Sequence, residues 1–142
     1  MSDATCRFLN TLSQSFMQGR LDAVVENFVF PIPLYAADSL QVFGAACTFK
    51  EVLTMYRDAT LNAGITRIEP RVVAEGLPVN GYSNVWVEWE HMDVAGNCVK
   101  TSQVHYVFYL AEAALFPKIE MIEYTMLAFP EISASFSMAK IA

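Results

Sequence analysis

Residues 65–127 read ITRIEPRVVAEGLPVNGYSNVWVEWEHMDVAGNCVKTSQVHYVFYLAEAALFPKIEMIEYTML, and this stretch decides the fold. It predicts long strands at about residues 65–77, 82–93, 98–110 and 117–128. Two segments, Asn80-Gly81 and Asp93–Asn97, predict compact turns, because Gly and Asn accept the positive φ that tight reversals require. We therefore expect a long antiparallel meander.

The chain before this stretch predicts helices and one short pair of strands. Apolar residues at helical spacing predict an amphipathic helix at about residues 3–18, and Gly19 ends it. A second, short helix begins near Leu21. Two short strands are expected next, at Ile32–Tyr35 and Leu40–Phe43.

The residues after this strand pair predict a long helix. Thr48 and Glu51 match the T-x-x-E capping box, and Gly64 is the expected C-terminal stop. The order of elements predicts an α+β fold, with helices packed on one face of a strongly curved, mostly antiparallel sheet of about six strands. We expect a single domain over residues 1–142, of which residues 129–142 form a loose tail.

The composition indicates more apolar surface than one small core needs. Hydrophobic residues make up 54% of the chain and charged residues only 17%, below the usual quarter. Such a chain either encloses an apolar cavity or covers a sheet face in an oligomer, and we expect both. The sequence therefore predicts a small apolar ligand and a homodimer.

Charge and cysteine content exclude several kinds of partner and location. The net charge is −6 and the 9 Lys and Arg residues are scattered, so we expect no nucleic-acid partner. No apolar run reaches the roughly 20 residues of a membrane span, and the N-terminus has no signal-peptide pattern, so no membrane partner is expected. Cys6, Cys47 and Cys98 lack CxxC spacing, which indicates free thiols and a cytoplasmic protein.

Three segments carry a resemblance to a known superfamily. Gly19–Ala23, Val85–Trp89 and Lys118–Tyr124 are similar to a helix entry, a central strand and the final strand of the nuclear-transport-factor-2-like (cystatin-like α+β) superfamily. Over about residues 5–129 the chain resembles its SnoaL-like polyketide cyclase and ketosteroid isomerase branch. The resemblance implies a cone-shaped sheet with a pocket open at one end and frequent homodimerisation through the outer sheet face. It implies isomerase, cyclase or dehydratase activity in some members and ligand binding alone in others.

Strand pairing predicts a polar cluster on one face of the meander. Residue numbers across the Asp93–Asn97 hairpin sum to about 191, and a last hairpin then brings Glu123 close to His105. The cluster consists of Trp86, Glu88, Gln103, His105 and Glu123. A histidine held by a carboxylate suits a general base that abstracts a proton beside a carbonyl, so His105 and Glu123 are the candidate catalytic residues.

The opposite face of the same strands is the alternative wall of the pocket. The residues expected to line it are Trp89, His91, Tyr106 and Phe108 from the meander, with Tyr35 from the first strand and Tyr56 from the long helix. His91 and His105 then point to opposite faces. The sequence leaves open which face is inward, and the polar cluster is a solvent-facing or dimer-facing surface if it lies outside.

Three functions remain open from the sequence. The first is binding of a small apolar molecule without catalysis, and the second is a cofactor-free isomerase, cyclase or dehydratase that transfers a proton on a small apolar carbonyl compound. The third is a dimeric interaction module with a filled core. Isomerases of the resembled branch carry a tyrosine on the first helix, which residues 3–18 lack, so we favour binding. Two histidines without ligand spacing predict no metal site, and we expect no cofactor.

Overall fold

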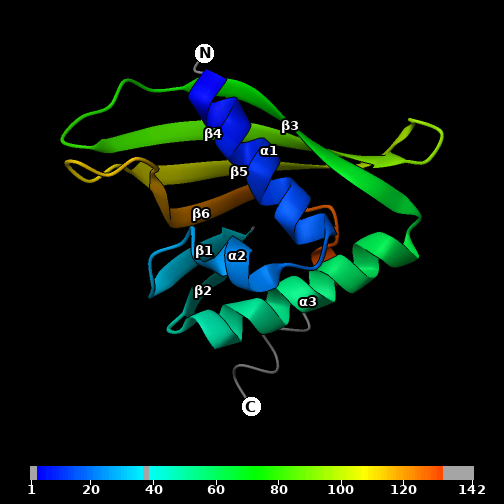
Figure 1. The fold of residues 1–142 in the computed structure, drawn as a ribbon. Coiled ribbons are helices and arrows are strands. Elements are labelled where there is room, and N and C mark those ends of the chain that lie inside the picture. The colour runs from blue at the N-terminus through cyan, green and yellow to red at the C-terminus, as the bar shows by residue number, and fades with distance from the viewer. Residues whose placement is uncertain (1–2, 37–38, 133–142) are drawn as a thin grey trace.

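The computed structural model describes residues 3–36 and 39–132, which form an α+β fold (Figure 1). The helices are α1 (Asp3–Met17), α2 (Leu21–Val25) and α3 (Ala46–Asn62). The strands are β1 (Ile32–Ala36), β2 (Ser39–Phe43), β3 (Ile65–Glu75), β4 (Tyr82–Asp93), β5 (Cys98–Tyr109) and β6 (Lys118–Met126). They form one sheet in the order β2-β1-β6-β5-β4-β3, in which only β1 and β6 pair in parallel. The predicted α+β fold with a mostly antiparallel, six-stranded sheet is confirmed.

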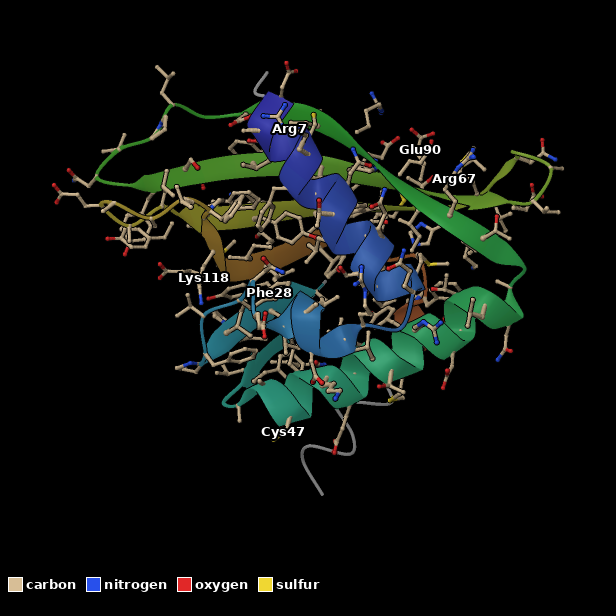
Figure 2. The ribbon with its side chains drawn as sticks, viewed as in Figure 1. Arg7, Phe28, Cys47, Arg67, Glu90 and Lys118 are labelled. Carbon is tan, nitrogen blue, oxygen red and sulfur yellow. The ribbon has the colours of Figure 1, made fainter. Side chains whose placement is uncertain are left out.

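The helices cover one face of the sheet, and the core lies between the two layers. α1 packs against β3, α3 contacts β2 and β3, and α2 contacts both other helices (Figure 1). Leu9 of α1, Phe49 of α3 and Val85 of β4 are almost fully buried there. Figure 2 shows Phe28, which follows α2, on the inner side and Cys47 on the outer side of α3. The burial of these apolar side chains is the main force that holds the helices to the sheet.

The sheet is twisted but not strongly curled, so the predicted strong curvature and cone are wrong in degree (Figure 1). Strong bending needs bulges or glycine kinks at matching positions of adjacent strands. Bulges interrupt the pairing of β3 with β4 and of β5 with β6, but the central pair, β4 and β5, runs without interruption from Tyr82 opposite Tyr109 to His91 opposite Lys100. The sheet therefore stays open, with β2 and β3 as its two edges.

The pairing register of the meander is the predicted one. Trp86 lies opposite His105 across β4 and β5, and Glu123 of β6 lies opposite His105 on its other side. At the hairpin between β4 and β5, the Asp93 amide donates to the Asn97 carbonyl at 2.9 Å. Correct turn chemistry and the two-residue period of a strand together fix which side chains share a face.

The start of α3 differs from the prediction. α3 begins at Ala46, and its N-cap residue Ala45 makes no side-chain hydrogen bond, so the capping box at Thr48 and Glu51 is wrong. Alanine has the highest helix propensity, which lets the helix begin two residues before Thr48. The end is as predicted, because Gly64 follows α3 with a φ of +79°.

The predicted loose tail begins too early. Phe129 and Ile132 are 4% and 8% exposed, and they pack in a cluster with Ile65 at the start of β3. These apolar side chains hold residues 129–132 against the domain, whereas residues 133–142 lie outside the described part of the chain. Across the described ranges, no helix is long and apolar enough to cross a membrane.

Candidate ligand-binding site

A cavity of about 130 Å³ lies between the sheet and the helices. Its wall is mostly apolar and receives side chains from all three helices and from every strand except β2. Leu12 of α1, Val24 of α2, Val52 of α3, Leu34 of β1 and Ile122 of β6 are typical of this wall. Concave, apolar cavities with a few polar groups are the usual sites of small-molecule binding.

Two neighbouring rows of paired residues show which face of the sheet is inward. The first row is Gln41, Leu34, Ile122, Tyr106 and Val85, and all of its members are buried. The second row is Leu40, Tyr35, Glu123, His105 and Trp86, and all of its members except His105 are exposed. Paired residues share a face, so the helices cover the first row and leave the second row outside.

The predicted ligand-binding residues divide between these faces, and Phe108, also expected at the wall, is buried on the inner face without lining the cavity. Four of them line the cavity: Tyr56, Trp89, His91 and Tyr106. The other four lie on the outer face and do not line it: Tyr35, Trp86, Glu88 and Gln103. The correction follows from strand geometry, because successive residues of a strand point to opposite faces.

His105 and Glu123 meet as the pairing predicts, but they meet outside the cavity. Nδ1 of His105 lies 3.0 Å from Oε1 of Glu123, and Nε2 lies 2.8 Å from Oδ1 of Asn84. The Trp86 ring stacks on the imidazole with centroids 4.7 Å apart. The expectation that this pair stands in a cavity lined by Trp86 is wrong, because the helices cover the opposite face of the sheet.

Three tyrosines from three different elements gather at the cavity: Tyr56 of α3, Tyr106 of β5 and Tyr124 of β6. Trp89 Nε1 donates a hydrogen bond to the Tyr106 hydroxyl at 3.0 Å. The sequence reasoning missed Tyr124. Side-chain alternation is the pattern that identifies it, since the residue after the outward-facing Glu123 must point inward.

Two of these hydroxyls lack a protein acceptor. Among residues 3–36 and 39–132, the hydroxyls of Tyr56 and Tyr124 make no hydrogen bond. Every fully buried side-chain oxygen or nitrogen in these ranges has a hydrogen-bond partner, so neither of these two hydroxyl oxygens is fully buried. Both oxygens therefore reach open space. Two further hydroxyls at the wall are already used, since Ser13 donates to the Ile68 carbonyl at 2.6 Å and Thr60 donates to the Tyr56 carbonyl at 2.7 Å. The Ser102 hydroxyl, also at the wall, makes no hydrogen bond to a described residue.

Burial keeps the three phenols protonated. It raises the pKa of Tyr124 to about 12. Burial also raises the pKa of Tyr106 well above its usual value, and the effect of Tyr124 raises it further. The pKa of Tyr56 is raised by burial first, and then by Tyr124 and Glu131. All three phenols are therefore neutral at physiological pH and can donate a hydrogen bond.

His91 is the buried imidazole of the cavity wall. Its Nδ1 lies 3.2 Å from the Trp89 carbonyl oxygen, and its ring meets the Phe129 ring edge-on at 6.2 Å. Burial lowers its pKa, although the backbone carbonyls of Trp89 and Lys100 partly oppose this effect. The charge of Lys100 adds a smaller lowering, so we assign His91 as the neutral form at pH 7.

The lowered pKa of His91 predicts a loss of stability in weak acid. As pH falls below about 6.5, the unfolded chain takes up a proton that the folded chain resists, so the free energy of unfolding decreases until the folded pKa is passed. We expect His91→Gln to reduce the difference in urea stability between pH 7.5 and pH 5.5. An equal difference in both proteins would contradict the assignment of a neutral, buried His91.

Solved structures with this arrangement of helices and sheet place the chain in a known fold. A protein of unknown function from Shewanella oneidensis, described as nuclear-transport-factor-2-like, is 13% identical with a TM-score of 0.62, over 86% of this chain and 96% of that chain. A domain of unknown function from Nostoc punctiforme, with a cystatin-like fold, is 12% identical with a TM-score of 0.59, over 100% of this chain and 89% of that chain. The chain has the nuclear-transport-factor-2-like fold.

A third structure extends the comparison to an enzyme subunit. The beta subunit of benzoate 1,2-dioxygenase from Burkholderia mallei is 13% identical with a TM-score of 0.57, over 85% of this chain and 87% of that chain. No protein-family profile and no curated protein matches the sequence. At these identities the nuclear-transport-factor-2-like likeness establishes the fold alone, and any function must be argued from the site.

Proposed function

We propose that the protein binds a small, largely apolar molecule in the cavity between its sheet and its helices. The observation that carries this proposal is the cavity itself, which has a volume of about 130 Å³ and a mostly apolar wall that includes two tyrosines whose hydroxyls make no hydrogen bond to a described residue. An apolar cavity of about 150 Å³ holds one benzene molecule. The expected ligand therefore has the size of one six-membered ring with short substituents.

The placement of polar residues favours binding over proton-transfer catalysis. A general base must reach the proton that it abstracts, and His105 and Glu123 lie on the sheet face that points away from the cavity. The likeness to the SnoaL-like polyketide cyclase and ketosteroid isomerase branch supports a pocket without supplying a catalytic pair inside it. The unfilled volume beside Tyr56 and Trp89 argues against an interaction module with a filled core.

Toluene is a direct probe of this proposal. A ligand that binds the folded chain and not the unfolded chain raises stability, so saturating toluene should raise the midpoint of thermal unfolding by several degrees. Native mass spectrometry of the purified protein should also reveal any ligand that it carries from the cell. The proposal fails if toluene leaves the midpoint unchanged and isothermal titration detects no heat of binding for toluene.

We also propose that the outer face of the sheet is covered by a second copy of this chain. Several large apolar side chains on this face are at least 40% exposed: Tyr35, Leu40, Val42, Trp86 and Met126. Large apolar side chains gathered on one exposed face, with polar residues among them, are typical of protein–protein contact sites. A two-fold axis would place the same patch against itself, which is the commonest form of self-association.

Trp86→Glu tests this interface. We expect the wild-type chain to sediment at micromolar concentration as a dimer, with twice the 15.9 kDa mass of one chain, and Trp86→Glu to sediment as a monomer. Val94→Glu is the matched control, because Val94 is 90% exposed in the hairpin between β4 and β5 and should leave the dimer intact. A wild-type mass of one chain would remove the proposal.

A further inference from the structure

The hydroxyls of two tyrosines and of Ser102 remain free at the cavity, and each of them can donate a hydrogen bond. The Tyr56 and Tyr124 hydroxyls have no partner in the described part of the chain. The Tyr106 oxygen already accepts a hydrogen bond from Trp89, so its own proton is left to donate. The three phenols, from α3, β5 and β6, thus offer hydrogen-bond donors within one mostly apolar cavity.

The wall carries no compensating charge. Among the described residues that line the cavity there is no Lys, Arg, Asp or Glu, and His91 is neutral. A carboxylate or ammonium group brought against such a wall loses its hydration and gains no ion pair, so its binding is strongly disfavoured. A neutral ligand does not carry this penalty.

We infer that the ligand is a neutral, single-ring molecule with one hydrogen-bond acceptor, such as a carbonyl oxygen, and that Tyr56 and Tyr124 donate to this oxygen. The inference rests on the proposed binding function and names the chemical class of its ligand. The apolar wall contacts the ring, and the phenols fix its orientation. A ligand that displaces water from these hydroxyls without replacing its hydrogen bonds leaves the hydroxyls unpaired, which lowers the affinity. An acceptor oxygen on the ligand avoids this loss.

Three probes of equal size separate the possible ligand classes. Acetophenone, benzoate and cumene each have about nine non-hydrogen atoms, so they fill the cavity similarly and differ in the polar group. Acetophenone carries a neutral acceptor, benzoate carries a charged acceptor, and cumene carries none. We expect isothermal titration to give an affinity for acetophenone about tenfold or more above those for benzoate and cumene.

Tyr124→Phe removes one donor and keeps the ring. We expect it to weaken acetophenone binding about five- to tenfold and to leave cumene binding within about twofold, because only acetophenone uses the hydroxyl. Tyr56→Phe should act in the same direction. Tyr82→Phe is the matched control, since Tyr82 lies at the start of β4, outside the cavity wall, and is 46% exposed.

Each outcome of this experiment separates the inference from the proposed function. Preference for acetophenone that disappears in Tyr124→Phe supports the inference. Equal binding of cumene, tighter binding of benzoate, or an unchanged affinity of Tyr124→Phe overturns the ligand class while leaving a binding function in place. Failure of all three probes and of toluene to bind overturns the proposed function and the inference with it.

Discussion

Replacing Phe49 with alanine is expected to lower the free energy of unfolding by about 3–5 kcal/mol, because it removes a buried ring at the centre of the core. Phe49 of α3 is 2% exposed, and its ring centroid lies 4.9 Å from Phe28, 5.9 Å from Phe30 and 5.2 Å from Phe43. Truncation leaves these three rings without their common neighbour. It also opens a cavity that the packed helices and sheet cannot fully close.

Urea unfolding at pH 7.5 measures this effect through the shift of the transition midpoint. The matched control is Phe116→Ala, because Phe116 is 71% exposed in the loop between β5 and β6. We expect the control to change the free energy of unfolding by no more than about 0.5 kcal/mol. Equal losses in the two variants would show that Phe49 does not hold α3 to the sheet.

Ser102→Leu is expected to weaken ligand binding strongly, because the larger side chain extends from the inner face of the sheet into the cavity. Ser102 of β5 is 5% exposed, lines the cavity and has no side-chain hydrogen bond to a described residue. The larger side chain occupies much of the roughly 130 Å³ that a ligand needs. We expect the affinity for toluene to fall about 100-fold, equivalent to about 2.8 kcal/mol.

The control for this variant keeps the same substitution on the same sheet. Ser83 of β4 pairs with Phe108 near the far end of the hairpin and does not line the cavity, so Ser83→Leu should bind toluene like the wild type. Circular dichroism must show both variants folded. Undiminished toluene binding by a folded Ser102→Leu protein would place the ligand somewhere other than this cavity.

Much of the fold and the strand pairing can be predicted from the sequence because each depends on local chemistry. The turn at Asp93–Asn97 fixes the hairpin, and the two-residue period then sets every pair up to His105 and Glu123. The start of α3 could not be placed in this way. Thr48 offers a cap in the sequence, but the alanines before it continue the helix and compete successfully.

The inward face of the sheet could not be predicted because both faces carry aromatic residues. Trp86 and Tyr35 on the outer face look as apolar in the sequence as Trp89 and Tyr106 on the inner face. Which face is buried depends on where the helices pack, and this is a long-range property of the chain. Tyr124 was missed for the same reason, since side-chain alternation assigns it to the cavity wall only when the inward face is known.

The fluorescence of the two tryptophans can report separately on self-association and on occupancy of the cavity. They lie three residues apart on β4, so Trp89 is 7% exposed in the cavity wall and Trp86 is 41% exposed on the outer face. An ionic quencher such as iodide reaches Trp86 and not Trp89. Quenched emission therefore follows self-association, and the unquenched, shorter-wavelength emission follows occupancy of the cavity. Both equilibria can be read from the same cuvette without a label.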